Sequence, residues 1–439
     1  MAQVCPFTGV HYDPARVPID RVVAPPYDVL SPEQQEALYA RDPHNIVRIM
    51  LNWATPQDTP ADNRYTRAAA FLADWLAAGI LVRDREPAFY EYVQRFAHPG
   101  DPSRRVERTT LFVALKLEPY ERGIVLPHEE THPKAKADRL DLMRATRSNP
   151  EPIYALYEDP GQEIPERLAA ARGAGPIVSA SVPPPFGDAP DEHVLFRHVD
   201  AQLAADIQAF MSARRVWIAD GHHRYETALN YQRERRAADG DPAELQGYDT
   251  MLVGLSSFED PGLIVLPTHR LVRNISADRM ESLAPLLERY FEVLPMTAAA
   301  AAEWIRDEQP SERRFALVHA GGAYGLVLRD LSQAVAGAAE GHCDAWKRLD
   351  VTILQTLVLD RTFGISWSAL AHTPDVAYTR DAAEALARVA SGEFQVACLL
   401  QNPTVTEVRD VASAGDKMPQ KSTFFYPKLW SGLILRSNL

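Results

Sequence analysis

The sequence predicts an α+β protein in which helices cover mixed sheets. Three observations support this fold class. Runs rich in aromatic and β-branched residues alternate with amphipathic stretches of helical period, the 439 residues exceed one ordinary core, and no internal repeat is evident. A hydrophobic fraction of 46% with 24% charged residues is typical of a folded globular protein. We predict two domains, residues 1–273 and 274–439, with the last strand of the second returning toward a site in the first.

The first predicted domain opens its regular structure with a helix over residues 65–78. Ala68, Leu72 and Trp75 recur at spacings of three and four, and Gly79 follows as a helix stop. Two aromatic-rich runs flank the turn-prone HPGDPSRR and predict a hairpin. The expected elements are strands over 87–96 and 109–120, a helix over 140–149, strands over 152–159 and 193–200, a helix over 201–213, and strands over 214–220, 248–258 and 263–272, the last two continuing one sheet.

The second predicted domain alternates helical and strand patterns and is expected to be layered in the same way. Its expected elements are helices over 276–291, 349–360 and 382–391 and strands over 313–320, 323–331 and 394–401.

Charge and composition narrow the classes of partner. Lys and Arg total 46 against 59 Asp and Glu, a net charge of -13, so the molecule as a whole repels nucleic acid and acidic membrane surfaces. No apolar run approaches the roughly 18 residues of a membrane span, and the N-terminus lacks signal-peptide features. Three scattered cysteines fit neither a disulfide framework nor a cysteine zinc site. We expect a cytoplasmic protein with a small-molecule partner, and the sequence leaves a homodimer open.

The segment IADGHHRYETALNY places a dense polar group between a predicted buried strand and a predicted helix. Unpaired N–H groups at a helix start favour an anion, glycine lets the backbone approach a ligand, and arginine forks onto two oxygens. These requirements for holding phosphate assign Asp220, Gly221 and Arg224 to phosphate binding. His222 and His223 are candidate catalytic groups, because histidines donate hydrogen bonds and shuttle protons near neutral pH.

The same corner also has a structural interpretation. Asp220 caps the helix, Gly221 serves the turn, and the histidines pair with neighbouring carboxylates; Asp220 is also suited to holding a cation. Five consecutive residues of this kind favour a site over that combination. A metal at the corner is disfavoured, because adjacent histidines in one turn point apart.

The segment VVAPPYDVLSPEQ stiffens the backbone with a double proline before a helix that SPEQ opens, with Ser31 as N-cap. A structural turn explains the prolines but not Asp28, which is a candidate catalytic residue. Tyr27 is a candidate substrate-binding residue.

The segment HEETHPKAKADR has hardly an apolar residue and is interpreted first as a solvated loop. The functional alternative is a mobile loop that brings a general base, Glu129, and cationic groups to a substrate. HEETH also matches the HExxH zinc string, but prolines on both sides disfavour the helix that a zinc pair needs, and the identity of any metal is left unknown. The candidate substrate-binding residues of the segment are His128, Thr131, Asp138 and Arg139.

The tail KMPQKSTFFYPKLWSGLIL interleaves lysines and hydroxyls with aromatic residues. Lysines and hydroxyls suit phosphoryl oxygens, so Lys421, Ser422 and Thr423 are predicted to bind phosphate. The structural alternative is a C-terminal strand whose aromatics pack and whose lysine stems lie along apolar surface.

Together, PPYDV, HEET followed by ADR, RSNPEPIYALY, IADGHHRYETA and MPQKSTFFYPKL resemble the bacterial and archaeal domain-of-unknown-function family ten-fifteen, from Pro6 to almost the last residue. More distantly, DGHHR looks like the phosphate-binding corner of the ParB and sulfiredoxin superfamily, whose members include kinases that phosphorylate free serine. This resemblance implies a ParB/sulfiredoxin-like strand–helix corner in the first domain.

The resemblance also implies a small-molecule phosphotransferase, with free serine as acceptor and pyrophosphate, ADP or ATP as co-substrate. On this hypothesis the DGHHR corner holds the transferred phosphate, Glu129 or Asp28 activates the acceptor hydroxyl, the lysines of MPQKST neutralise donor charge, and Mg²⁺ bridges phosphate oxygens. No GxxxxGK[ST] loop is present. A phosphoester hydrolase with the same phosphate cradle and a noncatalytic nucleotide-binding module are the alternatives.

Overall fold

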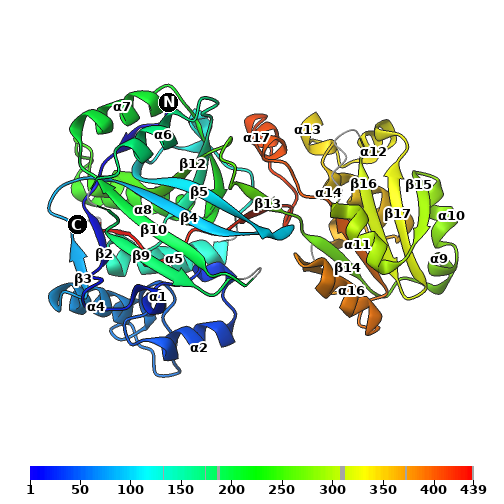
Figure 1. Ribbon diagram of the computed structural model, residues 1–439, viewed down its shortest axis with the longest axis horizontal. Coiled ribbons are helices and arrows are strands. Elements are labelled where there is room, and N and C mark those ends of the chain that lie inside the picture. The colour runs from blue at the N-terminus through cyan, green and yellow to red at the C-terminus, as the bar shows by residue number, and fades with distance from the viewer. Residues whose placement is uncertain (132, 174, 185–187, 307–311, 371–372, 438–439) are drawn as a thin grey trace. The chain divides into compact units, whose positions relative to one another are not determined.

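The chain folds into two compact units, shown in the computed structural model of Figure 1. Residues 1–131, 133–173, 175–184, 188–306, 312–370 and 373–437 are described. Unit 1 contains Met1–Ile264 and Pro427–Leu439, and unit 2 contains Val265–Tyr426. The sequence-based boundary lay after residue 273, whereas the compact units divide after Ile264 and again after Tyr426.

Unit 1 is built on a mixed sheet in the order β6, β11, β8, β12, β5, β4, β10, β9, with β1 pairing to β5. The predicted hairpin is present as β4 and β5, with Tyr90 opposite Phe112. The strands are β1 (Val4–Cys5), β4 (Phe89–His98), β5 (Asp101–Lys116), β6 (Val125–Leu126), β8 (Ile153–Tyr157), β9 (Val178–Val182), β10 (Asp191–His198), β11 (Val216–Asp220) and β12 (Thr250–Ser257).

A smaller sheet in unit 1 brings the two ends of the chain together. Its order is β3 (Leu81–Arg83), β2 (Gly9–Tyr12), β21 (Leu435–Ser437), β7 (Ser148–Asn149), and Gly9 of β2 pairs with Arg436 of β21. The C-terminal segment is therefore part of unit 1, although the chain forms unit 2 before reaching it.

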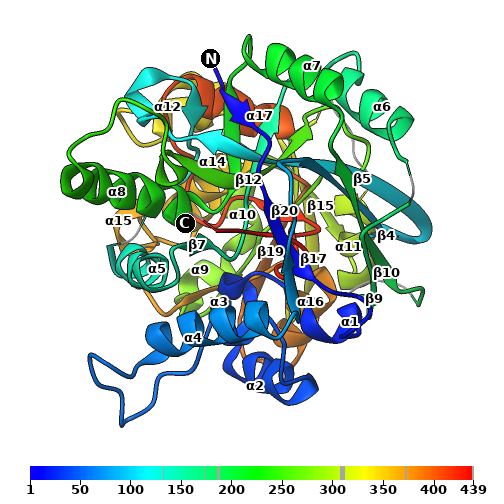
Figure 2. The same cartoon turned by 90° about the vertical axis from the view of Figure 1, so that its left-hand side faces the viewer.

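The helices of unit 1 pack on these sheets, and Figure 2 shows α5 beside α8. None of the helices in the described ranges has the length and apolar character needed to cross a membrane. The helices are α1 (Ile19–Val22), α2 (Pro32–Arg41), α3 (Val47–Met50), α4 (Arg64–Ala77), α5 (Pro133–Thr146), α6 (Glu163–Ala170), α7 (Ala201–Met211) and α8 (His222–Asp239), with 3-10 turns at Tyr27–Val29, Tyr120–Arg122 and Gly247–Asp249.

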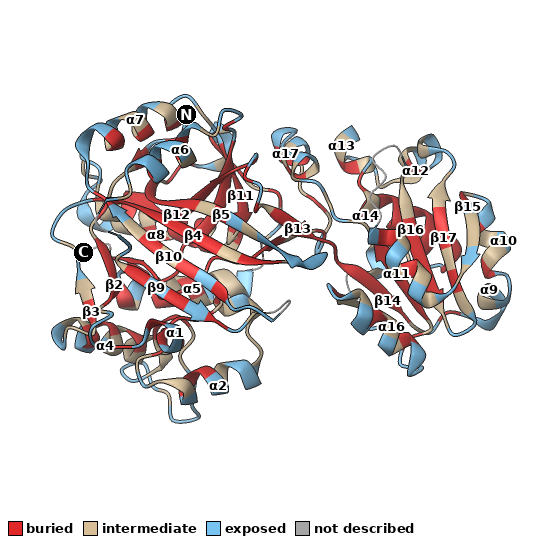
Figure 3. Ribbon diagram, viewed as in Figure 1, coloured by how far each residue is buried: buried red, intermediate tan, exposed pale blue. Residues whose placement is uncertain are grey.

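The core of unit 1 forms where one face of the large sheet meets α7 and α8. Ile153, Ile218 and Val253 pack there with Ile207 of α7 and Tyr225 of α8. Figure 3 shows the strands buried and the outer faces of the helices exposed. Burying an aliphatic or aromatic side chain of this size contributes roughly 1.5–3 kcal/mol, so this face fixes where the end of β11 and the start of α8 lie.

Helix α5 begins at Pro133, so residues 133–139 of the segment expected to be a solvated loop are helical. Proline suits the first turn of a helix because its fixed φ is already helical and its missing N–H is not needed there. The apolar pattern did not reveal this turn, because α5 is stabilised mainly by packing on α4 and α8.

Unit 2 contains an antiparallel sheet in the order β15, β17, β16, β19, β14, β18, and helices α11 and α16 cover one of its faces. Its strands are β14 (His269–Val272), β15 (Phe291–Met296), β16 (Arg314–His319), β17 (Gly322–Leu328), β18 (Val376–Thr379) and β19 (Val396–Leu400), and β13 (Ile264–Leu266) pairs separately with β20 (Phe424–Tyr426). The sequence predicted that the strands over 248–258 and 263–272 continue one sheet, and this prediction is wrong: β12 belongs to the large sheet of unit 1, whereas β13 pairs with β20 and β14 belongs to the sheet of unit 2.

The helices of unit 2 are shorter than predicted. The patterns over 276–291 and 349–360 each divide, the second into α14 and a π-helix, Leu354–Thr362. The helices are α9 (Ala277–Glu281), α10 (Leu283–Glu288), α11 (Ala298–Arg306), α12 (Leu331–Gly337), α13 (Asp344–Lys347), α14 (Asp350–Ile353), α15 (Trp367–Leu370), α16 (Ala382–Ala390) and α17 (Val405–Ser413).

The predicted strand–helix corner is present as β11, Gly221 and α8. Gly221 has a φ of 93° and a Cβ added to it would lie 2.8 Å from Cγ2 of Ile153. Gly240, at the other end of α8, has a φ of 77° but open space around its Cα. Both positions need glycine for the backbone, and only Gly221 also needs it for space.

We expect Gly221→Ala to destabilise unit 1 more than Gly240→Ala. Each change places alanine in the left-handed region at a cost of about 1 kcal/mol, and the clash with Ile153 adds about 1–3 kcal/mol. Urea unfolding of both variants measures the difference. Equal losses of unfolding free energy would show that the close approach of the corner to β8 does not constrain it.

Candidate functional site

The topology of the large sheet brings two of the predicted polar segments to one edge. Strands β6 and β11 run parallel, so their carboxyl ends lie at the same edge, and Glu129 follows β6 while Asp220 ends β11. Strand β8 is antiparallel to β11, so Glu151, just before β8, reaches the same edge. The HEET and DGHHR segments therefore meet because of strand direction.

Asp220 holds two cations at this edge. Its carboxylate accepts hydrogen bonds from Nζ of Lys428 at 2.5 Å and from Nη2 of Arg224 at 2.9 Å. Burial by itself raises the pKa of Asp220, but the charges of Lys428 and Arg224 outweigh it and the net shift is downward. The N-cap of α8 is Gly221, and Asp220 is used to orient cations rather than to cap the helix.

Arg224 lies buried beneath the corner. Its Nη1 donates to the carbonyl oxygen of Pro152, and its Nε has no hydrogen-bond partner among the described residues. Burial disfavours the guanidinium charge, yet Glu151, Asp28 and Asp220 together raise the pKa of Arg224. Arg224 also lines a cavity of about 30 Å³, which is large enough for an ordered water.

Glu151 is a buried carboxylate that the sequence analysis did not select. It accepts from the backbone N–H of Tyr27 at 3.0 Å and from Oγ of Ser431 at 3.1 Å, and it lies 3.6 Å from Arg139. Glu151 therefore joins the PPYDV segment to the C-terminal segment of unit 1, which contains Ser431. The one signal for it in the sequence is a charged residue between two prolines immediately before a buried strand.

The PPYDV segment places Tyr27 and Asp28 beside this cluster. The guanidinium of Arg139 stacks 4.0 Å from the ring centroid of Tyr27. Crowding by protein atoms and the charge of Asp220 raise the pKa of Asp28 to about 6, against the opposing charges of Arg224 and Lys428. Asp28 is nevertheless exposed to solvent, so it is crowded without being enclosed.

Two histidines lie beside Glu129. The buried His128 donates from Nδ1 to the carbonyl oxygen of Ile218 at 2.7 Å, and its backbone N–H donates to Nε2 of His222 at 3.1 Å. Burial lowers the pKa of His128 to about 4, so it is neutral at pH 7 and its Nε2 carries no proton. That bare nitrogen lies 3.8 Å from Glu129, and Nδ1 of His222 lies 3.6 Å from the other carboxylate oxygen.

Glu129 combines a perturbed pKa with access to solvent. Burial and the charges of Asp220 and Asp28 raise the pKa of Glu129 to about 7, while Lys428 opposes the shift. The side chain is still 38% exposed, because protein atoms crowd it on one side and solvent reaches it on the other. A carboxyl group that is partly protonated near neutral pH and accessible to a substrate is suited to proton transfer.

The remaining candidates in this part of unit 1 have other partners. Thr131 donates to Glu226 at 2.6 Å, and Lys136 pairs with the same carboxylate at 2.8 Å. Asp138 accepts from the hydroxyl of Tyr65 at 2.8 Å and pairs with arginines on α4 and α5. His223 is half-buried. Their predicted roles in substrate binding or catalysis stay predictions.

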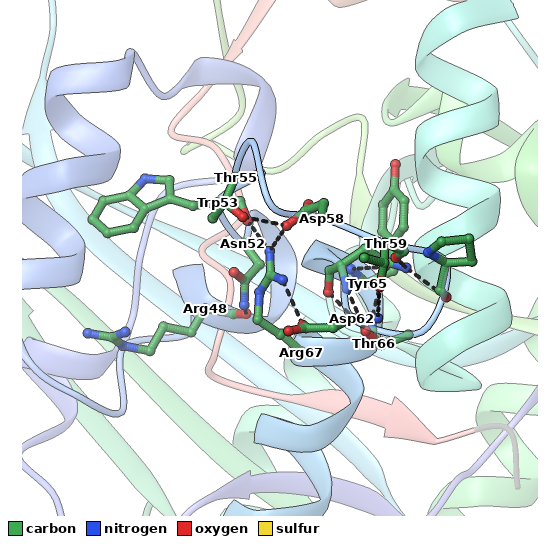
Figure 4. A network of polar contacts seen from close by, with 12 residues as sticks. Arg48, Asn52, Trp53, Thr55, Asp58, Thr59, Asp62, Tyr65, Thr66 and Arg67 are labelled. Carbon is green, nitrogen blue, oxygen red and sulfur yellow. Dashed lines mark hydrogen bonds and ion pairs between the residues drawn. The ribbon is translucent and has the colours of Figure 1, made fainter.

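Tyr65, which donates to Asp138, follows a loop that several hydrogen bonds hold in place before α4 (Figure 4). Arg67 donates to Asp58 and Asp62 and to the carbonyl oxygen of Trp53, each at 2.8 Å. These bonds close the loop over the first turn of α4, from which Tyr65 reaches Asp138. The polar contacts of Asp138 thus belong to the packing of α4 on α5.

The C-terminal segment contributes Lys428 to the cluster around Asp220. Lys428 lies in the lysine-containing tail identified from the sequence, but it was not among the predicted site residues. Lys421, Ser422 and Thr423 belong to unit 2. Ser422 donates from Oγ to the carbonyl oxygen of Pro419, and Nζ of Lys421 lies 4.5 Å from the ring centroid of Tyr378. Their predicted binding to phosphate stays a prediction.

The HEETH string does not form the helical pair of a zinc protease. His128 precedes the start of α5, and His132 lies outside the described residues. Within the described ranges, no group of three or more His, Cys, Asp or Glu side chains is arranged to hold a metal ion.

We expect carbon NMR titration of the carboxyl groups to give apparent pKa values near 7 for Glu129 and near 6 for Asp28. Asp220→Asn should lower both by roughly 0.5–1 unit and Lys428→Met should raise both by a similar amount, because these changes remove opposite charges. Shifts of the same sign in the two variants, or a Glu129 value near that of free glutamate, would contradict this electrostatic description.

Comparisons with known proteins place the chain in a family. The family model "Protein of unknown function (DUF1015)" matches residues 4–352. No curated protein sequence matches the chain. Among solved structures, the chain is similar to a free serine kinase in complex with AMP, with 14% identity, a TM-score of 0.33, and coverage of 72% of this chain and 86% of that chain.

Two further solved structures are similar at the same level. SbnI with C-terminal truncation from Staphylococcus aureus has 12% identity and a TM-score of 0.32, covering 72% of this chain and 85% of that chain. A conserved hypothetical protein from Pyrococcus furiosus has 14% identity and a TM-score of 0.31, covering 73% of this chain and 92% of that chain. TM-scores of this size do not establish a shared fold.

Proposed function

The chain belongs to the DUF1015 family, and from the site in unit 1 we propose that it is a small-molecule phosphotransferase. One observation carries this proposal. Glu129, with a pKa of about 7, lies beside the carboxylate of Asp220, which holds Arg224 and Lys428 at the first turn of α8. A proton acceptor beside fixed cations and a helix start is the combination that phosphoryl transfer needs.

The corner supplies the phosphate cradle. Asp220 occupies one donor of Lys428 and one of Arg224, and both cations carry further N–H groups. Gly221 turns the chain from β11 into α8, and the first turn of α8 adds its partial positive charge. Because Asp220 already fixes the two cations, little reorganisation is needed when a phosphate binds.

Glu129 supplies the base in this proposal. It takes the proton of the acceptor hydroxyl as that oxygen forms a bond to phosphorus, while the bond from phosphorus to the donor oxygen breaks and the donor leaves with the negative charge. The proton then passes from Glu129 to solvent. Nδ1 of His222 lies 3.6 Å from this carboxylate, and Asp28 is the second carboxylate available as a base.

The co-substrates are proposed by chemical class. The acceptor is a small hydroxyl compound, with free serine as the first to test, and the donor is pyrophosphate, ADP or ATP. Mg²⁺ usually takes one or two carboxylates with the remainder of its ligands from water and phosphate, and ionised Asp28 would supply one, which leaves Glu129 as the base. When bound, it would neutralise charge on the donor phosphates.

The test is phosphorus NMR of the full chain with Mg²⁺ and serine, offering pyrophosphate, ADP and ATP in turn. We expect a phosphoserine signal with one donor. Glu129→Gln should lower its rate by about 10²–10⁴-fold, because a general base is lost. Arg224→Ala should lower it by about 10²-fold or more, because a fixed charge at the phosphate is lost.

The matched control for Glu129→Gln is Glu130→Gln, which changes the adjacent, exposed carboxylate. The control should retain the wild-type rate. Release of inorganic phosphate alone would replace the proposal by a phosphoester hydrolase. Absence of turnover with every donor and acceptor, together with retained nucleotide binding, would replace it by a noncatalytic binding module.

A further inference from the structure

Unit 2 buries an arginine on its central sheet. Strand β14 lies between β18 and β19, and the register places Arg270 opposite Tyr378 on one side and Cys398 on the other. Its neighbour Leu271 belongs to the core cluster formed with α11 and α16, so Arg270 projects from the opposite face of the sheet. Arg270 is only 4% exposed.

Arg270 has very little compensation for its charge. Its Nη1 donates to the carbonyl oxygen of Thr268, and within the described ranges it has no ion pair and no second hydrogen bond. Burial lowers the pKa of Arg270 to about 10, still well above neutral, so the guanidinium remains charged. A buried cation without a counterion is strongly unfavourable, which makes this arginine difficult to explain by stability alone.

Two carboxylates line a small cavity that Arg270 also lines, and both are engaged elsewhere. Asp350 and Glu407 both line it, and both accept from Nη1 of Arg313, at 2.7 Å and 3.1 Å. Burial also raises the pKa of Asp350 to about 6, which reduces its negative charge near neutral pH.

Arg270 lines a small cavity that the MPQKST segment also reaches. The cavity has a volume of about 20 Å³, and its polar lining includes Thr268, Gln401 and Ser422. Arg270 lies 5.7 Å from the ring centroid of Tyr378, and Nζ of the exposed Lys421 lies 4.5 Å from the same centroid. Two cations thus gather around one ring beside a space large enough for an oxygen atom.

We propose that unit 2 binds a small oxyanion, a phosphate or the phosphate group of a small molecule, with Arg270 as its buried anchor and Lys421 and Ser422 beside it. One anion oxygen enters the cavity, and the rest of the anion remains near the exposed Lys421. This gives the MPQKST segment a binding role within unit 2. The proposal does not depend on catalysis in unit 1.

Hydrogen exchange of the full chain, resolved by peptide, tests the proposal with inorganic phosphate and with pyrophosphate, each against sodium chloride at matched ionic strength. Exchange should slow in peptides covering residues 267–272 and 417–423 at millimolar phosphate. Peptides from unit 1 report separately on the DGHHR corner, so the two sites are distinguished in one experiment. Larger protection by pyrophosphate would indicate a phosphate group of a larger molecule, and equal protection would indicate free phosphate.

The variant Arg270→Met separates a binding arginine from a structural one. It should abolish the protection in unit 2 and unfold at the same or a higher temperature without phosphate, because a buried uncompensated charge is removed. Arg270→Lys keeps the charge without the planar fork and should weaken the protection while retaining the fold. Arg273→Gln, which removes a partly exposed charge just after β14, is the matched control and should behave as wild type.

Two outcomes would overturn the proposal. One is protection of unit 2 peptides that persists in Arg270→Met, which would place the anion elsewhere. The other is absence of protection in the wild type, and a lower unfolding temperature of Arg270→Met would then assign Arg270 to stability alone.

Discussion

The site in unit 1 depends on the carboxylate of Asp220. It binds Lys428 and Arg224 at the same time and so joins the end of β11, the first turn of α8 and the C-terminal segment that returns after unit 2. Removing one partner of such a buried network leaves the other charges uncompensated, at a cost of about 3–5 kcal/mol. Asp220 therefore acts on stability and on the geometry of the phosphate cradle together.

The same carboxylate sets the protonation of its neighbours. Asp220 stays ionised because two cations hold it, and its charge then raises the pKa values of Glu129 and Asp28. Pushing the pKa values of adjacent carboxyl groups apart is how one site obtains both a fixed anion and a proton acceptor near pH 7. The neutral His128 beside Glu129 adds no competing charge.

The sequence predicts the strand–helix corner of β11 and α8 because the residues that form it are neighbours along the chain. Asp220, Gly221 and Arg224 follow a buried strand within one helical turn, so local rules are sufficient to place them. Glu151 and Lys428 could not be selected in this way, because their partners lie far away along the chain and are brought near by strand pairing. The predicted loop of HEETHPKAKADR differs for a related reason: packing on α4 and α8 stabilises a helix with little apolar pattern of its own.

A crystal structure of the full chain with pyrophosphate tests whether the corner of β11 and α8 binds phosphate. We expect a phosphate group at the first turn of α8, within hydrogen-bond distance of its backbone N–H groups and of Lys428 or Arg224, with Glu129 on the side open to the acceptor. Phosphate bound elsewhere in unit 1, with Asp220, Arg224 and Lys428 unchanged around solvent, would contradict it.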